Sequence, residues 1–185
     1  MLPTESSIYK ERHIQGDVRE ILGDGWDLMI AHPPCTYLSR AGGRWLYPKG
    51  ELDEERHRKG LEAKEFFMQL LEAPIKHIAI ENPTPFRIFE LPKHVQVIQP
   101  YMFGHPFSKR SLLWLKGLTP LKATDTLNDF TPYLPSNTGG KKRGQKHKIH
   151  GAAMGKKNRS RTFPGIAAAM ADQWGNVREE ICHGM

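Results

Sequence analysis

Residues 26–35 of this 185-residue chain read WDLMIAHPPC and join a short apolar run to an abrupt stop. The run at 26–31 is short for a helix and has the apolar composition of a buried β-strand. Pro33 and Pro34 cannot continue a helix, so the strand must end in a stiffened loop. We therefore predict a strand over 26–31 that leaves Cys35 in a fixed position just beyond its end.

The rest of the chain alternates in a similar way between apolar runs and Pro or Gly stops. Further buried strands are predicted over 77–80, 94–98 and 111–115, and a closing helix over 165–181. Residues 53–72 fit a helix, because Asp53 can cap its amino end and apolar residues recur on one face. This alternation favours one α/β domain, 1–185, with a largely parallel sheet flanked by helices.

The positive charge of the chain is concentrated in one segment. The net charge is +7, yet residues 141–161 contain nine basic residues and no acidic one, whereas the rest holds 18 basic and 20 acidic residues. The nine are Lys141, Lys142, Arg143, Lys146, Lys148, Lys156, Lys157, Arg159 and Arg161. They lie in a stretch rich in Pro, Gly and Lys, 117–163, which we predict to be a long irregular insertion. Such a block predicts contact with DNA phosphates, and a solvated loop is the alternative interpretation.

Composition also excludes several classes of protein. The sequence contains no apolar stretch long enough to span a membrane and no secretory signal at its start. The two cysteines, Cys35 and Cys182, are too few for a disulfide framework and fit a reducing cytoplasm. Since no Cys-x-x-Cys pair accompanies them, we predict no metal site.

Two strand ends carry the side chains with chemical potential. Cys35 follows the strand at 26–31, and Glu81 follows the apolar residues of the strand at 77–80. A thiolate is a strong nucleophile, and a neighbouring carboxylate can hold a substrate atom as an acid. Taken separately, each residue has an ordinary alternative: an inert cysteine, or a solvated loop carboxylate.

These stretches together resemble the DNA cytosine-5 methyltransferases, most closely short phage and prophage proteins of that kind. Residues 26–39 are similar to the catalytic loop of that family, with Pro-Pro-Cys and a serine four residues later. Residues 78–83 resemble its Glu-Asn-Val motif, with proline in place of valine. Residues 16–20 resemble its Gly-Asp turn, and 104–110 more loosely resemble a later motif with Gln and two Arg.

The resemblance implies a partial Rossmann-like methyltransferase fold and a set of residue roles. Cys35 and Glu81 would be catalytic; Pro34, Ser39, Asn82, Pro83 and Lys109 would bind the target base; Asp17 and Pro33 would contact the cofactor S-adenosylmethionine. DNA in the cytoplasm of a bacterial host would be the partner.

The chain also departs from the family. The glycine-containing cofactor loop and the ribose-binding acid lie upstream of the Gly-Asp turn in the family, and only fifteen residues precede Gly16 here. A shortened chain, or a second chain that supplies this region, are the explanations we consider. Two alternative functions stay open: a non-catalytic nucleic-acid-binding protein with the same fold, or an enzyme that modifies cytosine without a methyl donor.

Overall fold

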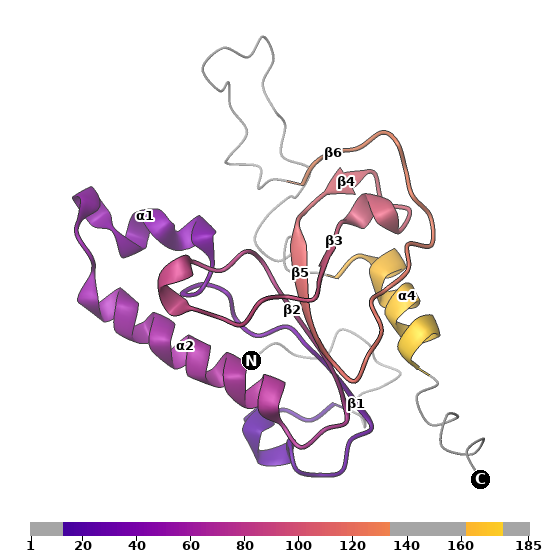
Figure 1. Cartoon of the computed structure of the whole chain (residues 1–185), viewed down its shortest axis with the longest axis horizontal. Helices are drawn as coiled ribbons and strands as arrows, with labels where there is room; N and C mark the ends of the chain where they lie inside the picture. The colour runs from indigo at the N-terminus through magenta and orange to yellow at the C-terminus, as the bar shows by residue number, and fades with distance from the viewer. Residues whose placement is uncertain (1–12, 134–161, 176–185) are drawn as a thin grey trace.

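The computed structural model describes residues 13–133 and 162–175, which form an α/β fold around a mixed four-stranded sheet (Figure 1). The strand order is β1-β2-β5-β3. These strands are β1 (Leu28–Ala31), β2 (His77–Asn82), β3 (Gln96–Ile98) and β5 (Ser111–Lys116). A separate parallel pair is formed by β4 (Phe107–Ser108) and β6 (Thr131–Pro132). The α/β class predicted from the sequence is confirmed.

All four predicted strands are present in the sheet, but the prediction that the sheet is largely parallel is wrong. β1 pairs in parallel with β2, whereas β5 runs antiparallel to both β2 and β3. The connections explain the difference. A helix-containing crossover joins β1 to β2, as a parallel pair requires, while residues 99–110 join β3 to β5 without crossing the sheet. β5 therefore begins at the end of the sheet where β3 stops, and it runs beside β3 in the opposite direction.

Helices cover both faces of the sheet, so the molecule has a core on each side (Figure 1). On one face, Ile80 and Trp114 pack with the buried residues of α2 (Glu54–Glu72). On the other face, Ala79 and Leu113 pack with α4 (Pro164–Trp174). Successive strand residues alternate between the two cores, as the two-residue period of a strand dictates.

The long helix begins where the sequence predicts. The Asp53 side chain accepts the backbone N–H of Arg56 at 2.7 Å and so caps α2. The closing helix α4 begins at Pro164, and residues 176–181 of its predicted range lie outside the described residues. The remaining helices are short: α1 (Gly43–Leu46), η2 (Val18–Ile21), η3 (Arg40–Gly42), η4 (Pro48–Gly50), η5 (Arg87–Phe89) and η6 (Pro100–Met102).

Part of the predicted irregular insertion packs closely on the α4 side of the sheet. Gln96 and Leu121 exchange two hydrogen bonds, at 2.7 and 2.8 Å, and Trp174 Nε1 donates to the Thr119 carbonyl at 3.0 Å. Residues 117–133 and 162–163 are the described part of the insertion. The nine basic residues between 141 and 161 lie outside the described residues.

In the part of the chain that the structure describes, no helix is both long enough and apolar enough to cross a bilayer.

Candidate active site

β1 and β2 end side by side, because they pair in parallel with Ala31 opposite Ile80. His32 directly follows β1, and Glu81 follows Ile80 within β2. Their side chains meet, with His32 Nδ1 3.2 Å from Glu81 Oε2. In α/β sheets, polar groups that follow the carboxyl ends of neighbouring parallel strands are the usual place for a ligand site. The structure therefore brings the two polar strand ends predicted from the sequence to one edge.

Asn82 links the Cys35 loop to the end of β2. Its side chain is 2 % exposed, and Asn82 Nδ2 donates a hydrogen bond to the Pro33 carbonyl at 3.0 Å. Within the loop, the Ser39 N–H donates to the Cys35 carbonyl at 2.9 Å, and Cys35 is half-buried. A buried hydrogen bond between two loops opposes their separation, because each polar group would otherwise be buried without a partner.

The backbone continues this connection beyond Cys35. The Arg40 N–H donates to the Thr84 carbonyl at 2.9 Å, and the Phe86 N–H donates to the Leu38 carbonyl at 2.7 Å. The loop that carries Cys35 and the segment that follows β2 therefore run alongside each other for several residues. Hydrogen bonds on both sides of Cys35 hold its backbone beside the segment that begins at Glu81.

The surroundings of Glu81 favour its ionised form. Burial raises the pKa of this carboxyl, but hydrogen bonds from His32 and Ser111 and the positive charge of Lys109 lower it by more. The net result is a pKa below the usual value of 4.5. At neutral pH Glu81 is a carboxylate, which accepts hydrogen bonds and attracts a proton that develops on a bound molecule.

Two of these partners of Glu81 were not predicted as site residues. His32 could have been found by counting register, since the residue that follows β1 must lie opposite Glu81 of β2. Ser111 begins β5, and its antiparallel pairing to β2 is not visible in the sequence. No pattern in a single sequence would have indicated Ser111.

The other predicted base-binding residues lie in or near these loops. Ser39 is buried, Pro34 is exposed and Pro83 is half-buried. Lys109 acts electrostatically on Glu81, and its Nζ also lies 5.9 Å from the centre of the Phe163 ring. Cys35, Asn82 and these residues form the candidate active site at the carboxyl edge of β1 and β2.

Asp17 and Pro33, the two residues predicted to hold S-adenosylmethionine, both have hydrogen-bond partners within the chain. Asp17 caps η2, and both of its carboxylate oxygens accept hydrogen bonds from Arg19. This pairing, led by the side-chain hydrogen bond, lowers the pKa of Asp17 to about 2. Pro33 is buried, and its carbonyl is bonded to Asn82. Asp17 is therefore already paired with an exposed arginine, and the Pro33 carbonyl with a buried amide.

Across residues 13–133 and 162–175, no group of three or more His, Cys, Asp or Glu side chains is placed to hold a metal ion.

No family model, curated protein or solved structure matches this chain.

Proposed function

We propose that this chain is a cytosine-5 methyltransferase-like protein that acts on cytosine in DNA, with Cys35 as nucleophile and Glu81 as the group that holds the base. One observation carries the proposal. The Asn82–Pro33 hydrogen bond and the His32–Glu81 contact hold a thiol loop and an ionised carboxylate at one sheet edge. The family resemblance of the same two segments supplies the substrate.

The chemistry that these residues support is a reversible addition to the cytosine ring. The target base first leaves the duplex, because C6 is out of reach in the stack. The Cys35 sulfur then forms a bond to C6, and the ring electrons shift so that C5 becomes electron-rich. The proton lost from the thiol ends on N3, where the Glu81 carboxylate accepts it in a hydrogen bond.

The methyl donor implied by the resemblance is S-adenosylmethionine. Because the Asp17 carboxylate already accepts hydrogen bonds from Arg19, we propose that the donor is held by a second chain. The basic segment 141–161 would bind DNA phosphates, which positions the strand without reading its sequence.

The pairing of Asp17 with Arg19 also favours a second candidate function. A protein that binds or modifies cytosine without a methyl donor needs Cys35 and Glu81 but no cofactor cradle. A non-catalytic nucleic-acid-binding protein would need neither reactive group. Covalent addition to a base distinguishes this last possibility from the other two.

The proposal is tested by covalent trapping on DNA that carries 2-pyrimidinone in place of cytosine. This base lacks the 4-amino group, which makes its C6 more electrophilic, so an adduct forms without any methyl transfer. The expected result is a slowly migrating band on a denaturing gel for the natural chain and for Cys182→Ser. Cys35→Ser should give no band. A band of equal intensity from Cys35→Ser would rule Cys35 out as the nucleophile.

A further inference from the structure

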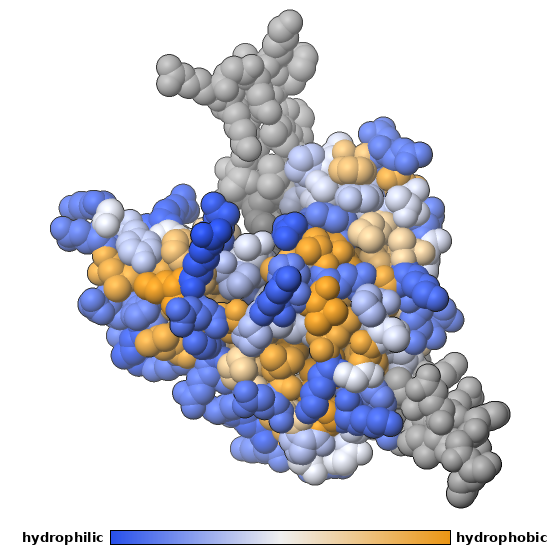
Figure 2. Space-filling model, in the orientation of Figure 1, coloured by the Kyte–Doolittle hydropathy of each residue, from blue (hydrophilic) through white to orange (hydrophobic). Residues whose placement is uncertain are grey.

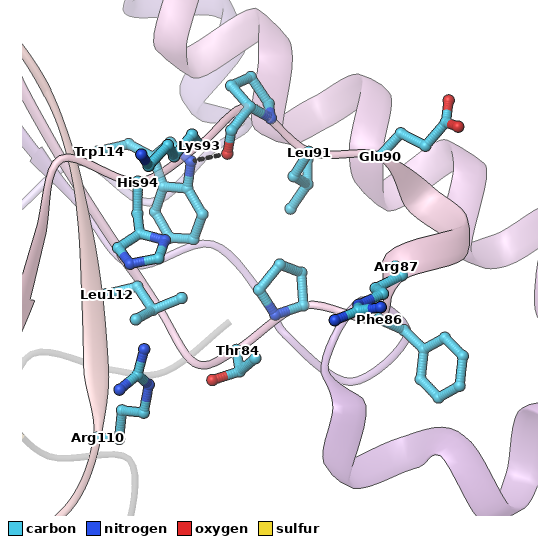
Figure 3. A pocket seen from close by; sticks show the side chains of 12 residues that line it. Thr84, Phe86, Arg87, Glu90, Leu91, Lys93, His94, Arg110, Leu112 and Trp114 are labelled. Carbon is cyan, nitrogen blue, oxygen red and sulfur yellow. Dashed lines mark hydrogen bonds between the residues drawn. The ribbon is translucent and has the colours of Figure 1, made fainter.

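A cavity of about 290 Å³ lies between β5 and the segment that follows β2 (Figure 3). It is lined by residues 84–87 and 90–94 and by Arg110, Leu112 and Trp114. Leu112 and Trp114 are buried residues of the core that packs on α2, and they form its apolar floor. The proposed chemistry at Cys35 uses none of these residues.

The rim of the cavity is strongly basic. Arg87, Lys93 and Arg110 contribute positive charge, and Glu90 is the acidic lining residue. In Figure 3 the Arg87 and Arg110 side chains approach the cavity from two different segments, while the Glu90 carboxylate points away from it. Neither arginine has an ion pair or side-chain hydrogen bond with another described residue. Guanidinium groups around a concave site are suited to bind a phosphate group.

The combination of charge and apolar surface narrows the class of ligand. Pro85 adds to the apolar lining, and His94 packs edge-on to the buried Trp114 with ring centres 6.0 Å apart. An inorganic anion would make no use of this apolar floor. A nucleotide unit has both an anionic phosphate and a deoxyribose whose C–H groups can pack on an apolar surface, and the cavity lies at the small end of ligand sites. On the visible face of the whole molecule, Figure 2 shows patches of apolar surface interspersed with hydrophilic side chains.

The position of the cavity relates it to the candidate active site. Thr84 is three residues beyond Glu81, a span of at most about 11 Å of extended chain. Arg110 directly precedes Ser111, whose side chain hydrogen bonds Glu81. Because side chains alternate along an extended chain, the side chains of Ser111 and Arg110 lie on opposite faces of the sheet. A lining residue of the cavity therefore follows Glu81 by three positions and another precedes Ser111 by one, which places the cavity near the same end of the sheet.

We propose that this cavity binds the phosphate and sugar of the nucleotide next to the cytosine held at Cys35 and Glu81. The inference rests on the proposed function, because cytosine at the active site is what defines the neighbouring nucleotide. The ligand chemistry is a phosphate ester of a cytosine nucleotide. It comes from a DNA strand in our proposal, and a free mononucleotide is the other source that the experiment separates.

The first test measures the affinity of a short single-stranded cytosine oligonucleotide by fluorescence anisotropy at several salt concentrations. Arg87→Gln and Arg110→Gln should each weaken binding by about fivefold to tenfold and lower the salt slope by about 0.7. Arg110→Lys keeps the charge and should bind within about threefold of the natural chain. Lys76→Gln is the matched control, because it removes one exposed charge at the opposite end of β2. If Arg87→Gln and Arg110→Gln each bind as tightly as Lys76→Gln, the proposal is overturned.

The second test removes the charge from the ligand instead. A methylphosphonate at the phosphate next to the target cytosine should weaken binding to the natural chain but have little further effect on Arg110→Gln. Full additivity of the two changes would refute a direct contact. If free deoxycytidine monophosphate binds as tightly as the oligonucleotide and loses its affinity in Arg110→Gln, the strand is not the ligand, and our assignment to DNA fails.

The trapping experiment separates this inference from the proposed function. If Cys35 traps the modified base normally while Arg87→Gln and Arg110→Gln each bind as tightly as Lys76→Gln, the proposed phosphate site is refuted and the proposed function stands. If no adduct forms yet the two arginine variants lose affinity as expected, the phosphate site stands without that chemistry.

Discussion

Asn82 holds the Cys35 loop against β2 at the scale of a single side chain. It is buried, and its amide is bonded to a carbonyl of a loop 49 residues earlier in the chain. In the proposed function, Cys35 and Glu81 act on one base, which requires that their two segments stay together. Through this hydrogen bond, the amide of Asn82 acts as a positioning group in this account.

Asn82→Leu should impair both stability and trapping. The leucine fills a similar volume but leaves the Pro33 carbonyl without its partner, which costs about 1–3 kcal/mol of unfolding free energy. Urea denaturation measures this loss, and the rate of trapping on 2-pyrimidinone DNA should fall with it. Asn128→Ala, at an exposed asparagine, is the control and should match the natural chain. Unchanged trapping by Asn82→Leu would show that the link is not needed.

Glu81 should make the stability of the protein depend on acidic pH. Its folded pKa lies below the usual 4.5, so its stabilising interactions are complete above that value. They are lost as the pH falls from about 4.5 through the folded pKa, because the carboxylate then takes up a proton.

Urea denaturation at several pH values checks this dependence. The unfolding free energy of Glu81→Gln should fall less steeply below pH 4.5 than that of the natural chain. Glu51→Gln changes an exposed carboxylate and should follow the natural chain. Parallel curves for Glu81→Gln and the natural chain would disprove the role of His32 and Ser111 as partners of ionised Glu81.

At the scale of elements, the sequence predicts the strands and the long helix well. Burial gives the strands their apolar runs, and the Asp53 cap marks the start of α2, so both leave a local signal. Strand direction leaves no such signal, and the reversed β5 was therefore missed. The contact of Ser111 with Glu81 depends on that reversal, so it could not be predicted either.

The packing of α2 against the segment after β2 is testable at Gly60. A β-carbon added there would lie 2.1 Å from the ring of Phe89, in η5. Alanine improves helix propensity by about 1 kcal/mol, but overpacking costs about 1–3 kcal/mol. Gly60→Ala should therefore lower the unfolding free energy in urea denaturation, despite the better helix former.

Gly23→Ala is the control for this change, since no atom lies within 4 Å of its added carbon. It should leave stability nearly unchanged. If Gly60→Ala is more stable than the natural chain, the close contact of α2 with Phe89 is not present in solution.

At the scale of the whole molecule, cores on both faces of the sheet leave its carboxyl edge for chemistry. The residues proposed to hold the base lie at this edge, whereas the predicted cofactor residue Asp17 is paired with Arg19. Isothermal titration calorimetry should accordingly show no saturable heat when S-adenosylmethionine is added to this chain alone. Submicromolar binding would mean that the chain holds the donor itself.

The most direct test of the central claim maps the adduct formed with 2-pyrimidinone DNA when no methyl donor is present. After digestion with trypsin and nuclease, tandem mass spectrometry identifies the modified residue. We predict a single nucleotide adduct on Cys35, formed by the natural chain and much more slowly by Glu81→Gln. An adduct on Cys182, or none at all with a folded protein, would contradict the account.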